Sequence, residues 1–287
     1  MSEAPQSFLA ACVQMRSSCD VAENVATAAA LISEAAEKGA ALVMTPEMTS
    51  LLVTKTGDLF ASVREEKDDE ALAAFRALAV EKDIWLLAGS LPIKLSATKV
   101  ANRSFLISPE GEVAARYDKI HMFDVDLEGG ESYRESKNYE PGREAIIAKL
   151  PWGRIGLTVC YDVRFPHLYR TLAQAGADFL SVPAAFTKQT GEAHWHTLLK
   201  ARAIETGCFV FAPAQGGKHE CGRETYGHSL VIAPWGEVIA EAAHDEPGVI
   251  LAEIDTGRIA SARRKVPSLG HDRGFVLPEG EKTRRVS

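Results

Sequence analysis

The sequence lacks any apolar run long enough to span a bilayer. Its longest apolar runs have the length of a strand, far below the about 20 residues that a membrane helix needs. The N-terminus carries no Lys or Arg before its first apolar stretch, which argues against a signal peptide. We therefore expect a cytoplasmic protein without a membrane partner.

Positive charge is also in short supply. The 32 Lys and Arg residues face 39 Asp and Glu residues, which gives a formal net charge of −7. General nucleic-acid binding depends on Lys and Arg that neutralise phosphates, so we expect no nucleic-acid partner. The Gly129-Gly130 pair indicates a flexible loop rather than a phosphate-binding loop, because no Gly-x-x-x-x-Gly-Lys-Ser/Thr motif is present.

Cysteines are few, odd in number and unevenly spaced, without a Cys-x-x-Cys pair. Such usage fits a reducing cytosol better than a disulfide framework. Cys12 and Cys208 lie within apolar strand patterns and are expected to pack in the core. Cys221 lies near His219, which raises the question of a metal site. Two candidate ligands do not make a structural zinc site, so no metal is predicted. The five cysteines are Cys12, Cys19, Cys160, Cys208 and Cys221.

What the chain does contain is an alternation of strand and helix patterns. Hydrophobic residues make up 46% and charged residues 25% of the 287 positions, as in globular proteins. The pattern predicts an α/β fold with a single domain over residues 1–287, whose core covers about residues 8–272. It includes strands at 8–15, 41–44, 84–89, 154–159, 179–182, 208–212 and 249–254, and helices at 20–38, 69–82, 167–176, 192–206 and 255–265.

Two similar hairpins interrupt this alternation. Residues 109–113 and 234–238 share the turn pattern Pro-x-Gly-Glu-Val, each between two short strand patterns. The recurrence indicates an internally duplicated, two-layer architecture, although common turn chemistry is an alternative explanation. Between the hairpins, residues 121–143 are expected to form a long irregular loop, and such loops are usually functional.

Cys160 is the thiol with the strongest functional signal. It ends an apolar strand and precedes a helix, and reactive groups in α/β folds gather at the carboxyl ends of strands. An unperturbed thiol would be only about 3% ionised at neutral pH, so a nearby base or cation is needed. Glu47 ends another strand and Lys119 follows a third, yet each alone would be interpreted as a surface charge. A buried, inert cysteine is the alternative interpretation of Cys160.

Three segments make the sequence recognisable. They are Thr45-Pro46-Glu47, Tyr117-Asp118-Lys119-Ile120-His121 and Gly156-Leu157-Thr158-Val159-Cys160-Tyr161-Asp162-Val163-Arg164-Phe165-Pro166. In this order they resemble the nitrilase superfamily of carbon–nitrogen hydrolases, over about residues 8–272. The resemblance implies an αββα sandwich and a catalytic triad of Glu47, Lys119 and Cys160.

The resemblance also implies the roles of neighbouring groups. Glu135 is similar to the family's second glutamate, and the backbone N–H of Tyr161 would join Lys119 in holding an oxyanion. Arg164 near the nucleophile could pair with a substrate carboxylate or with Asp162 or Glu135, and Phe186 and Thr187 follow a strand end that could line the pocket. Hydrolysis requires no electron or group carrier, so no cofactor is implied.

Within this superfamily the sequence is similar to Nit-type amidases, among them deaminated glutathione amidases. The segments that carry this similarity are residues 193–206 and Tyr226-Gly227-His228-Ser229. The implied function is hydrolysis of a small carboxylate-bearing amide through a Cys thioester, with release of ammonia. A homodimer or higher homo-oligomer is expected. The chain departs from the family at His196, where Glu is usual, and in its C-terminal ending.

Four other functions stay open at this point. An omega-amidase acting on α-ketoglutaramate shares much of the pattern, and a nitrilase would use the same thiol. A non-catalytic ligand-binding protein could have the same fold. A Cys–His enzyme would use His167 or His228 as its base. Because Glu47 raises and Lys119 lowers the pKa of Cys160, we expect a thiol whose deprotonation is coupled to attack rather than a stable thiolate.

Overall fold

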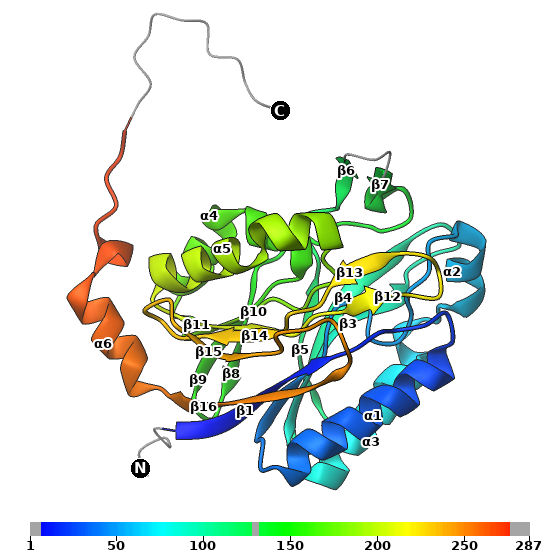
Figure 1. Ribbon diagram of the computed structural model, residues 1–287, viewed down its shortest axis with the longest axis horizontal. Helices are drawn as coiled ribbons and strands as arrows, with labels where there is room; N and C mark the ends of the chain where they lie inside the picture. Colours follow the sequence, from blue (N-terminus) through cyan, green and yellow to red (C-terminus); the bar gives the residue numbers. More distant parts are fainter. Residues whose placement is uncertain (1–6, 128–131, 276–287) are drawn as a thin grey trace, which may run out of the picture.

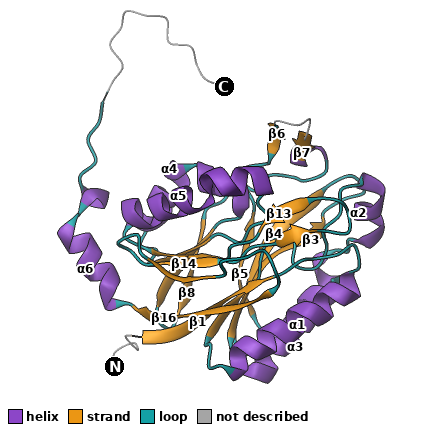
Figure 2. Cartoon of the chain, viewed as in Figure 1, coloured by secondary structure: helices purple, strands orange, loops and turns teal. Residues whose placement is uncertain are grey.

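The computed structural model describes residues 7–127 and 132–275, whose strands form two six-stranded sheets (Figures 1 and 2). The Gly129-Gly130 pair and the C-terminal ending from residue 276 lie outside the described residues. The first sheet has the order β16 (Gly248–Asp255), β1 (Ser7–Gln14), β2 (Leu42–Met44), β3 (Trp85–Lys94), β4 (Val100–Ile107) and β5 (Val113–Asp118).

The second sheet has the order β15 (Val238–Glu241), β14 (Leu230–Ile232), β11 (Phe209–Ala212), β10 (Phe179–Ser181), β9 (Gly153–Leu157) and β8 (Ile146–Leu150). Two small hairpins lie beside the sheets, β6 (Asp124–Asp126) with β7 (Ser132–Arg134) and β12 (Gly216–Lys218) with β13 (Glu224–Tyr226).

Helix pairs cover the outer faces of the stacked sheets. Figure 1 shows α1 and α3 along one outer side and α4 and α5 along the opposite side. This arrangement confirms the predicted αββα sandwich. The helices are α1 (Val21–Glu37), α2 (Thr56–Ser62), α3 (Glu70–Lys82), α4 (Pro166–Gln174), α5 (Lys188–Thr206) and α6 (Gly257–Lys265). Short 3₁₀ turns are η1 (Glu66–Asp68), η3 (Glu135–Lys137), η4 (Cys160–Arg164) and η5 (Ser268–Gly270). Among the described residues, no helix combines the length and the apolar character that a membrane crossing requires.

The alternation of side chains along a strand explains why these strands are apolar on both faces. In β1, Ala10 and Cys12 belong to the core between the two sheets, whereas Ala11 and Val13 belong to the core under α1 and α3. Successive side chains of a strand point to opposite faces, so a central strand of a sandwich buries both. Cys12 and Cys208 are both fully buried in the same hydrophobic cluster, which confirms their predicted packing role.

The two sheets have the same pattern of pairing. In each, three parallel strands (β1, β2, β3 or β9, β10, β11) continue into two antiparallel strands, and an antiparallel strand borders the other edge. The two hairpins predicted from the repeated turn are β4–β5 and β14–β15. This shared pattern of pairing favours internal duplication over a chance recurrence of turn residues.

The first helix begins where the sequence predicts, since the Asp20 side chain caps α1 and accepts the N–H of Glu23 at 2.9 Å. However, α5 begins at Lys188 rather than near residue 192, because the Thr187 side chain accepts the N–H of Thr190 and so caps an earlier turn. The predicted irregular loop at 121–143 also contains the β6–β7 hairpin and the turn η3.

Gly89 is the point where strand β3 passes closest to the segment that follows β2. A Cβ at this position would lie 1.9 Å from the Thr45 carbonyl oxygen and 2.6 Å from that of Pro46. Backbone atoms cannot move aside as a flexible side chain does. The glycine is therefore required for the segment that carries Glu47 to lie against β3.

We expect Gly89→Ala to lower the free energy of unfolding by about 1–3 kcal/mol, the usual cost of overpacking. Urea denaturation would measure this change. Gly57→Ala in the exposed helix α2 is the matched control, because a Cβ there meets nothing within 4 Å. Equal stability of the two variants would contradict the steric argument.

Candidate active site

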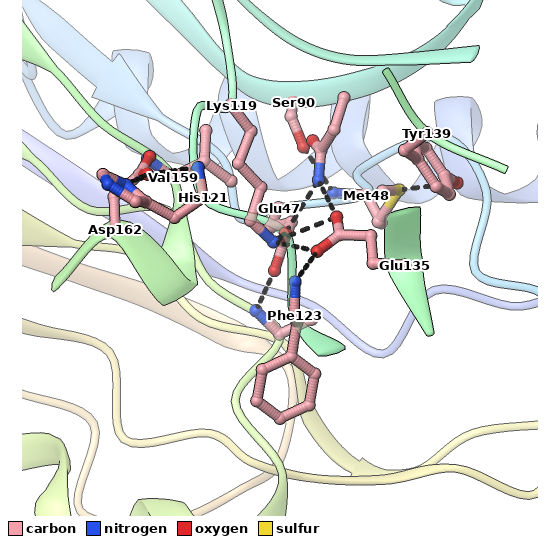
Figure 3. Close-up of polar contacts among 12 residues, drawn as sticks. Glu47, Met48, Ser90, Lys119, His121, Phe123, Glu135, Tyr139, Val159 and Asp162 are labelled. Atoms are coloured by element: carbon pink, nitrogen blue, oxygen red, sulfur yellow. Dashed lines mark hydrogen bonds and ion pairs between the residues drawn. The ribbon is translucent and has the colours of Figure 1, made fainter. Parts of the chain in front are cut away.

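The three predicted catalytic residues each follow the end of a strand and meet between the two sheets. Glu47 lies three residues after β2 and Lys119 directly after β5, both from the first sheet, while Cys160 follows β9 of the second. The Lys119 Nζ lies 2.9 Å from Glu47 Oε1, and the same carboxylate is close enough to the Cys160 thiol to raise its pKa. Figure 3 shows how Glu47, Lys119 and Glu135 converge.

The Glu47 carboxylate is buried and fixed from several directions. Its Oε1 accepts hydrogen bonds from Lys119 Nζ and from Asn102 Nδ2, both at 2.9 Å. Its Oε2 accepts the backbone N–H of Ala185 at 2.9 Å. A carboxylate bound in this way keeps one orientation. Its remaining acceptor sites can accept the proton of the Cys160 thiol.

Glu135 contacts the lysine rather than the nucleophile. Lys119 Nζ donates to its Oε2 at 2.8 Å and to its Oε1 at 3.0 Å, and the N–H of Phe123 donates to Oε2 at 2.7 Å. Asn102 Nδ2 also donates to Oε1, at 3.1 Å, and so links both glutamates. Sequence reasoning missed Asn102, because an Asn within an apolar strand carries no local functional signal.

The charges of the site set the protonation states. Burial and the Glu47 carboxylate raise the pKa of the Cys160 thiol well above its usual range, against the opposing effect of Lys119. Burial raises the pKa of Glu47, but the charges of Lys119 and Arg223 outweigh this and lower it. Burial lowers the pKa of Lys119, but Glu135 and Glu47 raise it well above its usual value. At neutral pH the site therefore holds a carboxylate, an ammonium and a protonated thiol.

A strained turn presents the nucleophile. Cys160 has a φ of 48°, in the left-handed region that non-glycine residues seldom occupy, and it opens the turn η4. The buried Asp162 carboxylate holds this turn. It accepts the N–H of Val159 at 2.8 Å and the backbone and ring nitrogens of His121 at 3.1 and 2.7 Å (Figure 3). It also accepts the hydroxyl of Tyr117 at 2.7 Å. Asp162 lies within the recognised motif, which is the signal that could have identified it.

A cavity of about 250 Å³ opens over the triad. The predicted residues Tyr161, Phe186 and Thr187 line it. So do the four candidate catalytic residues, Glu47, Lys119, Glu135 and Cys160. Its other lining residues are both apolar, among them Leu51, Leu52, Leu59 and Phe123, and polar, among them Lys55, Arg134 and Arg223, which supply positive charge. A concave pocket that joins apolar walls to convergent polar groups is typical of small-molecule sites.

Arg164 does not belong to this lining. Its guanidinium lies 5.2 Å from the centroid of the Phe186 ring and 5.9 Å from that of Tyr161, and both terminal nitrogens lie 3.3 Å from His194 Nδ1. The alternative ion pairs with Asp162 or Glu135 are not among its contacts. The expected ion pairs were therefore wrong, whereas the expected contact of Arg164 with a substrate carboxylate stays a prediction.

The histidines proposed as an alternative base are occupied elsewhere. His167 packs edge-on against the rings of His121 and Phe165, and His228 stacks on Tyr226 at 4.2 Å. Neither lines the catalytic cavity. The base beside the thiol is Glu47, which speaks against a Cys–His enzyme.

One group of side chains in the described part of the chain has the composition of a metal site. His196, His228 and Glu241 present ligand atoms within 4.8 Å of one another. His196 Nε2 lies 2.8 Å from Glu241 Oε1, an ordinary hydrogen bond between the two side chains. The residue that departs from the family, His196, thus contacts Glu241 and does not line the catalytic cavity.

His219 directs both ring nitrogens to the protein rather than to Cys221. Its Nδ1 donates to the Ser17 carbonyl at 2.9 Å, and its Nε2 accepts from the Thr225 hydroxyl at 2.7 Å. Burial, aided by the nearby charges of Arg223 and Arg16, lowers the pKa of His219 from 6.5 to about 4. The neutral imidazole is the form that fits this position.

The family model of carbon-nitrogen hydrolases matches residues 9–264 of the sequence. The chain belongs to this family. This chain is 42% identical over 273 residues to a protein of Synechocystis sp. named deaminated glutathione amidase. The match covers 94% of this chain and 99% of that protein.

Solved structures agree. The NitFhit protein of C. elegans superimposes with a TM-score of 0.87 at 37% identity, over 94% of the carbon-nitrogen hydrolase and 66% of the longer chain. A mutant amidase of Nesterenkonia sp. AN1, whose active site cysteine carries added acrylamide, superimposes with a TM-score of 0.76 at 26% identity, over 91% and 98% of the two chains.

The pKa of Cys160 can be tested by the ultraviolet absorbance of its thiolate, as the difference between the wild type and Cys160→Ala. We expect no ionisation of this thiol across neutral pH, because burial and Glu47 raise its pKa. In Glu47→Gln the thiolate should form at lower pH than in the wild type, since one cause of the raised pKa is removed. A fully ionised Cys160 at neutral pH in the wild type would contradict this electrostatic description.

His219 predicts a pH dependence of stability. Above pH 6.5 the imidazole is neutral in both the folded and the unfolded chain, and its contribution to the free energy of unfolding is complete. Between pH 6.5 and about 4 the unfolded chain binds a proton that the folded chain does not, so the free energy of unfolding falls as pH falls. The loss reaches roughly 3 kcal/mol at the lower limit.

Urea denaturation at several pH values in this window would measure the effect. We expect a shallower pH dependence in His219→Gln than in the wild type. The matched control is His271→Gln, which changes an exposed histidine and should retain the wild-type slope. The explanation fails when the slope of His219→Gln equals that of the wild type.

Proposed function

We propose that the protein hydrolyses the amide of a small carboxylate-bearing substrate, similar to deaminated glutathione, through a thioester on Cys160. The observation that carries this proposal is the cavity of about 250 Å³ whose lining brings Cys160 together with the buried Glu47 carboxylate and the Lys119 ammonium. Family membership and relatives named deaminated glutathione amidase support the substrate class.

Glu47 acts as the general base in the first step. It takes the thiol proton while Cys160 Sγ attacks the amide carbonyl carbon, so that a C–S bond forms and the carbonyl π electrons move to oxygen. General base catalysis of this kind contributes about 10²- to 10⁴-fold. Because the proton leaves during attack, the high thiol pKa does not prevent reaction at neutral pH.

The developing oxyanion needs donors that are already in place. The Lys119 ammonium is one, since Glu47 and Glu135 hold it within the cavity lining and it can exchange one of its two hydrogen bonds to Glu135 for a bond to the oxyanion. The N–H of Tyr161 is the other, because it directly follows Cys160 at the start of η4, where the first N–H groups lack partners within the turn. Removal of one such donor typically costs about 10²- to 10³-fold in kcat.

Collapse of the tetrahedral intermediate breaks the C–N bond. Glu47 returns its proton to the departing nitrogen, and the acyl group stays on Cys160 as a thioester. Water then attacks the thioester with Glu47 again as base, and the released thiol recovers its proton. One carboxylate therefore serves in both halves of the reaction, which requires its fixed orientation toward Cys160.

The leaving group depends on the amide. Deaminated glutathione contains only secondary amides, so its hydrolysis releases an amine rather than the ammonia expected from sequence. Ammonia is the product from a primary amide such as α-ketoglutaramate. The two substrates consequently need different detection reactions. Assembly as a homodimer or higher homo-oligomer and a cytoplasmic location stay predictions.

The direct test measures amine release from deaminated glutathione and ammonia release from α-ketoglutaramate. We expect hydrolysis of a carboxylate-bearing amide by the wild type and a loss of at least about 10³-fold in Cys160→Ala and Glu47→Gln, because each removes a partner of the chemical step. Comparable stability of the variants, measured by thermal denaturation, is the control.

Each alternative has its own result in this assay. Preference for α-ketoglutaramate identifies an omega-amidase. Ammonia release from a nitrile but from no amide identifies a nitrilase. Retained activity in Glu47→Gln would favour a Cys–His enzyme, and the absence of Cys160-dependent turnover of any amide or nitrile would favour a ligand-binding protein.

A further inference from the structure

Arg223 occupies a position in the catalytic cavity that the chemical step does not use. It lies in the loop before β13 and lines the cavity together with Cys160, Lys119 and Phe186. It belongs to none of the motifs that carry the family resemblance. Its charge reaches the catalytic base, since it is one of the causes that lower the pKa of Glu47.

The guanidinium of Arg223 contacts a backbone carbonyl and an aromatic ring, but no carboxylate among the described residues. Its Nη2 donates to the Ala185 carbonyl, and its guanidinium lies 5.3 Å from the centroid of the Tyr133 ring. Its buried Nε has no hydrogen-bond partner among the residues that the structure describes. Within residues 7–127 and 132–275, no carboxylate forms an ion pair with it. A partly buried guanidinium in this state favours an anionic partner.

The other cations of the cavity are engaged or exposed. Lys119 is held between Glu47 and Glu135, and Arg134 pairs with Asp126 at 2.8 Å. Lys55 is an exposed residue of the lining. Among the described lining residues, Arg223 is thus the cation that combines partial burial with the lack of a carboxylate partner.

We propose that Arg223 binds the carboxylate of the amide substrate and so determines the preference for anionic amides. This inference rests on the proposed amidase function. A guanidinium presents planar N–H pairs that match the two oxygens of a carboxylate. The Ala185 carbonyl fixes the side chain, while the Ala185 N–H fixes Glu47, so one short segment positions both the base and the carboxylate-binding group.

The test compares glutaramate, which ends in a carboxylate, with pentanamide, an amide of equal chain length that ends in a methyl group. The wild type should prefer glutaramate. In Arg223→Met we expect this preference, the ratio of the two kcat/KM values, to fall about 100-fold, mainly through the KM of glutaramate. Arg223→Lys should give an intermediate ratio, because an ammonium keeps the charge but loses the planar pair of donors.

Two controls separate recognition from stability. Arg76→Met removes an arginine that likewise donates to a backbone carbonyl, that of Gly111, but does not line the cavity, and it should keep the wild-type ratio. Calorimetric binding of glutarate to Cys160→Ala, with and without Arg223→Met, measures carboxylate affinity independently of turnover. Arg223→Met should weaken this binding about 100-fold.

An equal fall in kcat/KM for both amides, or unchanged glutarate binding, would overturn the inference and indicate a structural role. A lost preference in Arg164→Met but not in Arg223→Met would assign the carboxylate to Arg164 instead. A wild type that cleaves neither these amides nor those of the previous section contradicts the amidase function itself. A wild type that cleaves pentanamide as well as glutaramate contradicts only the role of Arg223.

Discussion

The chemistry of this site depends on one buried ammonium between two carboxylates. Were Lys119 paired with Glu47 alone, the ion pair would be neutral and Glu47 a weak base. Glu135 supplies the second negative charge, and the three side chains together carry one net negative charge. Lys119 therefore stays protonated while Glu47 retains the capacity to accept a proton. Loss of any member would leave a buried charge without its partner, which is a costly state.

The duplicated sandwich explains how such a cluster can be assembled. Each sheet contributes parallel strands whose carboxyl ends lie near one another, and the glutamate and lysine come from one sheet while the thiol comes from the other. The relative placement of these three side chains is thus set by the packing of the two sheets. The strained turn at Cys160 is tolerated because Asp162 binds the backbone on one side and Pro183 O accepts the Cys160 N–H on the other.

The sequence was sufficient for the fold class, the hairpins and the candidate catalytic residues that the structure brings together, because strand-end positions and contiguous motifs are local signals. It was insufficient for the groups that hold them. Asn102 bridges two glutamates through contacts 55 and 33 residues apart along the chain, which no local pattern records. The partner of Arg164 was equally hidden, since its guanidinium contacts His194, which lies 30 residues further along the chain. Arg223, in a loop without a motif, becomes visible only once the cavity is formed.

The position of Arg223 also connects substrate binding with the strength of the base. Its positive charge lowers the pKa of Glu47 in the free site, so the free carboxylate is a weaker base than its surroundings would otherwise make it. A substrate carboxylate bound to Arg223 offsets that charge, and the proton affinity of Glu47 rises when an anionic amide occupies the cavity. A neutral amide leaves the charge uncompensated. Recognition of the anion therefore favours the first proton transfer as well as binding, and the thiol stays protonated until the substrate is present.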